Sequence, residues 1–218
     1  MLSLLQHSQP THPKGTMSLE SWVMRPRWAP EDTASLEGKC RGSLLDDWAE
    51  NIGQDFGATA VDTIREGLQA VGLSLPDRPR TNEWYPVGTQ LRMMEILLDE
   101  IADRDITALR TFLMKRLFRH RILRFMARRY GLKRILGQAE GIHRQCYDVG
   151  HASSVVRGRR AQVTSAGSEL VRHPTWQLLQ LVGYLTIGNL VGTADVSVSG
   201  RLIDATHPAF VADIVWDV

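Results

Sequence analysis

A length of 218 residues with 43% hydrophobic content allows one substantial core, so we predict a single domain at residues 36–218 behind an irregular extension at 1–35. The formal net charge is only +2, and two cysteines are too few for a disulfide framework, which favours a reduced, cytoplasmic setting. No apolar run approaches the roughly 20 residues that span a bilayer, so the sequence predicts no transmembrane segment.

The first 35 residues combine four prolines with serine, threonine and glycine, a composition that predicts little regular structure. Trp22, Val23 and Trp28 either dock on the domain or form a surface for a partner, and Met17 is an alternative start of the chain.

Helical patterns follow from residue 36. Leu44, Leu45, Trp48 and Ile52 are spaced for an amphipathic helix that ends near Gly53. A second helix is predicted over 58–71, and Gly72 stands where a left-handed cap would end it. Proline disfavours the helical conformation of the residue before it, so the pair Tyr85-Pro86 predicts an extended lead into a helix from Val87. Apolar residues three and four apart then continue through two helices, as far as Tyr130.

The stretch from Arg110 to Arg134 contains no acidic residue and is strongly basic. It fits a solvated helix face, because arginine stems can lie over apolar neighbours. It also fits a docking surface for anionic lipid, nucleic acid or an acidic protein, and less well a dedicated DNA reader. The residues predicted for this anionic-partner surface are Arg116, Arg119, Arg121, Arg124, Arg128 and Arg129.

After Gly137 the period of the pattern changes. Residues 153–157 and 159–165 are predicted as strands around a turn at Gly158, and the alternating segments 194–199 and 210–217 as two more. Between the pairs, a helix from Pro174 to Val191 is apolar almost all round and must be covered on several sides. The fold class is therefore α+β, with an N-terminal helical half packed on a C-terminal antiparallel sheet and a buried helix between the strand pairs. Leu185 and Trp216 are predicted to be buried.

The apolar helix is either simply core or one wall of a ligand pocket. Gly183 and Gly188 leave gaps without side chains, and such gaps would allow an apolar pocket between the helix and the sheet. The residues predicted to line it are Trp176, Leu179, Gly183, Tyr184 and Ile187.

Catalytic motifs are absent from the sequence, including the Gly-x-Ser-x-Gly elbow, the phosphate-binding Gly-Lys-Ser/Thr loop, His-Glu-x-x-His, Cys-x-x-Cys and a dinucleotide glycine fingerprint. His143, Cys146 and His151 could offer ligands to zinc or iron, or an axial histidine to haem, but they have no evident fourth partner and fit a surface loop as well. We therefore predict no catalytic residue, no metal and no cofactor. An enzyme would need polar residues gathered in one cleft, drawn from Glu83, Tyr85, Arg92, His143 and His151.

Four segments carry a family resemblance: Arg41-Gly-Ser-Leu-Leu-Asp-Asp-Trp, Val71-Gly-Leu, Glu83-Trp-Tyr-Pro-Val and Phe210-Val-Ala-Asp-Ile-Val-Trp. Over residues 36–218 the chain resembles the myxobacterial paralogous family of unknown function. That family is similar to a ligand-binding superfamily comprising the 4-vinyl-reductase-type sensory domain, the haem nitric-oxide-binding domain and the Golgi transport-particle subunits. The Tyr-x-Ser-x-Arg motif of haem nitric-oxide sensors is missing, and Cys146 does not match the lipidated cysteine of the transport-particle subunits.

The resemblance implies a helical half on an antiparallel sheet, with a small apolar molecule or a protein as partner. We therefore expect a non-catalytic cytoplasmic sensory or regulatory domain. The alternative is a protein-interaction scaffold module that acts through the basic helix surface, and formation of a homo-oligomer stays open.

Overall fold

The structure is a computed structural model that describes residues 17–119, 129, 131–192 and 195–217. Its α-helices are α1 (Leu19–Val23), α2 (Pro30–Ala34), α3 (Trp48–Phe56), α4 (Ala58–Gln69), α5 (Val87–Ile96), α6 (Ile106–Arg119), α8 (Ala139–Cys146) and α9 (Pro174–Val191). Three shorter helical segments are η1 (Gly42–Leu44), η2 (Leu97–Ile101) and η3 (Glu169–Arg172). The segment η2 is a π-helix that continues α5.

The strands form two antiparallel sheets. β1 (Lys39–Arg41) and β2 (Trp84–Pro86) make a two-stranded ladder in which Cys40 lies opposite Tyr85. The larger sheet has the order β3-β4-β6-β5 and contains β3 (His151–Arg157), β4 (Arg160–Ala166), β5 (Val196–Ile203) and β6 (Ala209–Trp216). The chain therefore leaves the sheet after β4, runs through α9, and returns to add the last two strands.

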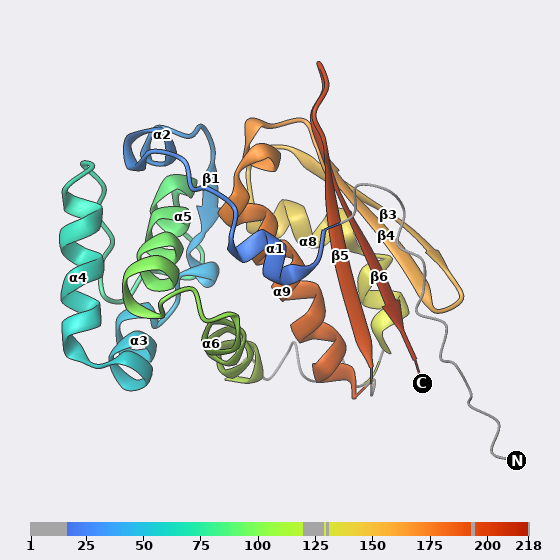
Figure 1. Ribbon diagram of the computed structural model, residues 1–218, viewed down its shortest axis with the longest axis horizontal. Helices are drawn as coiled ribbons and strands as arrows, with labels where there is room; N and C mark the ends of the chain where they lie inside the picture. Colours follow the sequence, from blue (N-terminus) through green and yellow to red (C-terminus); the bar gives the residue numbers. More distant parts are fainter. Residues whose placement is uncertain (1–16, 120–128, 130, 193–194, 218) are drawn as a thin grey trace, which may run out of the picture.

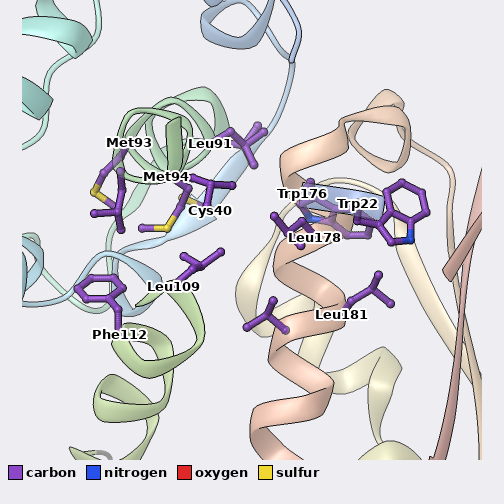
Figure 2. Packing of buried hydrophobic residues seen from close by; sticks show 14 of the residues in the cluster. Trp22, Cys40, Leu91, Met93, Met94, Leu109, Phe112, Trp176, Leu178 and Leu181 are labelled. Carbon is purple, nitrogen blue, oxygen red and sulfur yellow. The ribbon is translucent and has the colours of Figure 1, made fainter. Parts of the chain in front are cut away.

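Helix α9 lies between the N-terminal helices and the large sheet (Figure 1). Helices α3 to α6 lie on one side of it, the sheet lies on the other, and α8 packs beside β3. One cluster of buried side chains runs through both halves and includes Met93, Leu109 and Phe112 around α5 and α6, and Trp176 and Leu181 on α9 (Figure 2). The predicted α+β architecture, including the helix between two strand pairs, is confirmed.

Helix boundaries follow the local signals at most ends. Gly72 and Gly192 adopt φ angles of +72° and +78°, as expected of glycines that cap α4 and α9 in the left-handed conformation. Both ends of the first predicted helix differ from the prediction. Leu44 belongs to the separate turn η1 and α3 begins only at Trp48, and α3 then passes through Gly53 and ends at Phe56, before Gly57 with φ +91°. A glycine in a helix costs some stability but does not stop the helix unless the chain must turn there.

The composition of the first 35 residues predicts an irregular extension, but residues 17–35 form α1 and α2 and pack on the domain. Trp22 is 1% exposed and meets the Phe210 ring edge-on, with 5.5 Å between ring centres. Met17 pairs with Gly200 at the free edge of β5. The segment is short and rich in proline, yet its apolar side chains fill space on α9 and the sheet.

A buried polar cluster joins α2, α5 and the start of α9. The Thr33 hydroxyl lies 3.0 Å from His173 Nε2, and the hydroxyls of Thr33 and Thr175 donate to Glu95 Oε1 at 3.4 and 3.2 Å. Glu95 and His173 are almost fully enclosed, at 1% and 0% exposure. These hydrogen bonds satisfy Glu95 Oε1 and His173 Nε2, whereas Glu95 Oε2 and His173 Nδ1 have no hydrogen-bond partner among the described residues.

Two further observations concern membranes and burial. Among the residues that the structure describes, no helix has both the length and the apolar character needed to cross a bilayer.

Trp216 is buried at 6% exposure, whereas Leu185 is only partly buried, so one of the two side chains predicted for the interior lies at its margin.

Candidate functional site

A cavity of about 250 Å³ lies on the side of α9 that faces the other helices. Its α9 wall consists of Leu179, Gln180, Gly183, Tyr184 and Ile187. The facing walls come from η1, α5, α6, the 131–136 helix, α8 and β3, through Ser43, Leu44, Gln90, Met94, Leu113, Ile135, Leu136, Ala139, Ile142, His143, Cys146, Tyr147 and Ala152. The sheet contributes only Ala152, so most of the wall is helical.

Two glycines of α9 explain why the cavity lies on this side. A Cβ atom built on Gly183 would meet no atom within 4 Å, so this position opens directly onto free space. A Cβ on Gly188 would lie 2.5 Å from Val196 Cγ2, so this glycine instead allows β5 to approach α9 closely. A Cβ atom on Gly200 would also be too close to its neighbours, at 2.8 Å from Phe210 Cζ. The sheet therefore packs closely on α9 at these two positions, and the cavity lies on the other side of the helix rather than between helix and sheet.

Four of the five predicted pocket residues line this cavity: Leu179, Gly183, Tyr184 and Ile187. Trp176 does not line it. Its side chain is 0% exposed in the core, with ring centres 6.0 Å from Phe210 and 6.2 Å from Tyr147. Trp176 stands one turn before Leu179 and Gln180, on the same face of α9, but its ring packs on Tyr147 and Phe210 and does not line the cavity.

Charged residues are absent from the described part of the cavity wall. Its ionisable side chains are also held neutral. Burial lowers the pKa of His143, an effect strengthened by His151 and opposed by the hydrogen bond to Val149. Burial raises the pKa of Cys146 to about 11 and also raises the pKa of Tyr184. At neutral pH the described wall therefore presents neutral groups only.

His143 is held in one tautomer by a backbone carbonyl. Its Nε2 lies 2.9 Å from Val149 O, and because a carbonyl can only accept, Nε2 carries the proton. Nδ1 of the neutral ring is then a hydrogen-bond acceptor. Gly150, with φ +70°, shapes the turn that brings this carbonyl back over the ring.

The other residues considered for a metal site or for catalysis are dispersed. His151 is exposed on β3, and Glu83 and Tyr85 lie together at the surface, where the Tyr85 hydroxyl donates to Glu83 at 3.3 Å. Arg92 pairs with Glu95 and Glu100. Within the described ranges no group of three or more histidine, cysteine, aspartate or glutamate side chains could hold a metal ion.

Most residues of the predicted anionic-partner surface lie outside the described residues or at the edge of them. Arg121, Arg124 and Arg128 lie outside the described residues, Arg116 and Arg119 belong to the last turns of α6, and Arg129 is exposed. A docking role for this surface stays a prediction.

The arrangement of elements around the cavity can be compared with known structures. A point mutant of the T. Tengcongensis H-NOX domain aligns with a TM-score of 0.56 and 13% identity, covering 82% of this chain and 98% of the other. An oxygen-binding H-NOX domain related to soluble guanylate cyclases, in its oxygen complex, aligns with a TM-score of 0.53 and 14% identity, covering 82% and 95%.

This chain has the H-NOX fold. No protein-family model matches its sequence, and no curated protein matches it either. At such low identity the likeness concerns the fold alone. The resemblance to the haem nitric-oxide-binding superfamily is confirmed at that level, whereas membership of the myxobacterial family stays a prediction.

Proposed function

We propose that the domain binds a small, neutral, apolar molecule in the cavity beside α9 and acts as a sensory or regulatory module. The observation that carries the proposal is Gly183, which exposes the backbone of a core helix to a largely apolar cavity of about 250 Å³. Small-molecule sites are concave and mostly apolar with a few polar groups, and this cavity has that composition, so it is a candidate binding site. The H-NOX fold supports the proposal, because a neighbour with this fold binds oxygen.

A haem does not fit the described residues. Another neighbour contains a haem with a distorted porphyrin, and a haem in this chain would need room for the macrocycle and cations for its two propionates. The cavity of about 250 Å³ is smaller than the roughly 300–1,000 Å³ of sites for drug-sized ligands. Its described wall offers no arginine or lysine, and His143 Nε2 is bonded to Val149. We therefore propose a smaller ligand and derive no step through a haem.

A cavity-filling variant tests the proposal. Gly183→Leu places a side chain in the free space, and we expect it to abolish saturable binding of naphthalene, a neutral bicyclic probe, measured by calorimetry and by the shift of the melting temperature. Gly141→Leu is the matched control, because Gly141 is an exposed glycine of α8 with no atom within 4 Å of its Cβ position. The control variant should bind as the wild type does.

Two results would contradict the proposal. One is wild-type protein that binds neither naphthalene nor a polar bicyclic compound of similar size. The other is binding that survives Gly183→Leu unchanged, since the probe would then occupy another place.

The cytoplasmic setting is proposed from the two free thiols alone.

A further inference from the structure

Gln90 is an unusual member of the cavity wall. It lies in α5, where nine of the ten residues are buried, and its own exposure is only 7%. Its amide oxygen is enclosed and accepts no hydrogen bond from the described residues. A buried acceptor without a donor is unfavourable, because the group has lost its hydration without compensation.

The amide of Gln90 also influences the neighbouring Tyr147. Burial raises the pKa of Tyr147 well above its usual range, and a hydrogen bond from Gln90 partly opposes this effect. Only the amide nitrogen can donate such a bond, so the oxygen is the group left over. The terminal torsion of a glutamine side chain is broad, which allows a small rotation to bring the oxygen to a ligand in the cavity.

Cavity size and charge limit what that ligand can be. An apolar cavity of roughly 150 Å³ holds a benzene molecule, so about 250 Å³ suits a bicyclic compound. A carboxylate or an ammonium group would be buried without a partner, because the described wall carries no opposite charge. The described wall carries several acceptors, and among them Gln90 Oε1 is the enclosed oxygen that has no hydrogen-bond partner.

We propose that the ligand is an uncharged molecule of bicyclic size with one N–H or O–H donor, and that this donor bonds to the amide oxygen of Gln90. The inference rests on the proposed function and adds the chemical class of the ligand. An apolar body fills the space beside Gly183, while the donor supplies the hydrogen bond that the folded protein lacks on Gln90.

Indole and benzofuran test the proposal, because they have nearly the same shape and differ in one donor. We expect wild-type protein to bind indole at least about ten-fold more tightly than benzofuran by calorimetry. Gln90→Met removes the amide at similar length and should abolish this preference while benzofuran still binds. Gln180→Met is the matched control, since Gln180 lines the same cavity, and it should keep the preference.

Should Gln90→Met fail to fold, the wild-type protein still provides the decisive measurement. In its complex with indole, nuclear magnetic resonance should show contacts between the indole N–H and the side-chain amide of Gln90. Equal binding of indole and benzofuran, as expected if an ordered water satisfies the oxygen, would overturn the inference and leave the proposed function standing. Binding of neither compound, nor of naphthalene, would overturn both.

Discussion

At the level of single residues, His173 is the side chain whose burial has the clearest thermodynamic consequence. It is fully enclosed at the start of α9, its ring centre lies 4.8 Å from that of Trp28, and burial lowers its pKa to about 3, helped by the charge of Arg27. In the unfolded chain the same imidazole has a pKa near 6.5. Between these values the unfolded state binds a proton that the folded state does not, so the contribution of His173 to stability falls as the pH falls.

We therefore expect His173→Asn to be less sensitive to acid than the wild type. Lowering the pH from 7 to 5 should cost the wild type about 2 kcal/mol through this one group, measured as the free energy of unfolding in urea. The variant lacks the group and should lose correspondingly less between the two pH values. If the variant loses as much stability as the wild type between pH 7 and pH 5, the pKa of His173 is not lowered in the folded protein.

Glu95 provides a control of opposite sign. Burial raises its pKa, against the effects of Arg92, Thr175 and Arg27, so the folded state keeps a proton that the unfolded state has released above pH 4.5. This contribution is present below pH 4.5 and is lost as the pH rises through the folded pKa. Glu95→Gln should remove that loss, and should leave the acid loss due to His173 in place.

At the level of elements, α9 offers a direct comparison between two glycines in one helix. Gly183→Ala should stabilise the protein by about 0.5–1 kcal/mol, because the added methyl group enters free space and alanine favours helix. Gly188→Ala should instead destabilise it by about 1–3 kcal/mol, because its Cβ would lie 2.5 Å from the stiff side chain of Val196. Adding Val196→Ala should relieve that clash. Equal effects of the two alanines in thermal unfolding would contradict the assignment of cavity and contact sides.

The same helix shows how far sequence reasoning reached. The helix from Pro174 to Val191, its glycine cap and the alternating strands on either side were predictable, because each has a periodic or capping signal in the local sequence. Which of the two glycines leaves free space was not predictable, since that depends on Val196 approaching from another strand. β1 was missed for a similar reason: three residues are too few to show alternation, and their partner β2 lies about forty residues later.

At the level of the whole molecule, the cavity lies where the two halves meet, and its polar members come from elements far apart in the sequence. Gln90 belongs to α5, whereas His143 and Cys146 belong to α8, and Tyr184 to α9. The apolar helix alone identified four residues of one wall, but the facing wall could not be predicted because nothing in a single sequence reports which helices pack across from α9. Gln90 on the buried side of α5 was the polar wall residue that sequence reasoning missed, because its burial depends on the elements packed around α5.

The N-terminal segment 17–35 is the other feature of the whole molecule that composition concealed, and Trp22 tests how strongly it is attached. Trp22→Ala should lower the free energy of unfolding by about 3–5 kcal/mol, because it empties a fully buried site against Phe210. Trp84→Ala is the matched control. The Trp84 side chain is partly buried and pairs with the Arg41 guanidinium 4.0 Å above its ring, a contact of about 0.5–1 kcal/mol, so its loss should be markedly smaller.

Guanidinium titrations of the two tryptophan variants, followed by circular dichroism, make the comparison independent of which fluorophore was removed. If the segment is an integral part of the core, Trp22→Ala shifts a single transition, because α1 packs on both α9 and β5 and its loss weakens both halves together. If the segment only rests on the surface, the two variants unfold at similar denaturant concentrations. Arg25 provides a further check, since its guanidinium donates to Gln177 at 2.7 Å and holds the segment on α9 from a second point. The double variant Trp22→Ala/Arg25→Ala should therefore lose less stability than the sum of the losses of the two single variants, because both contacts fix the same segment.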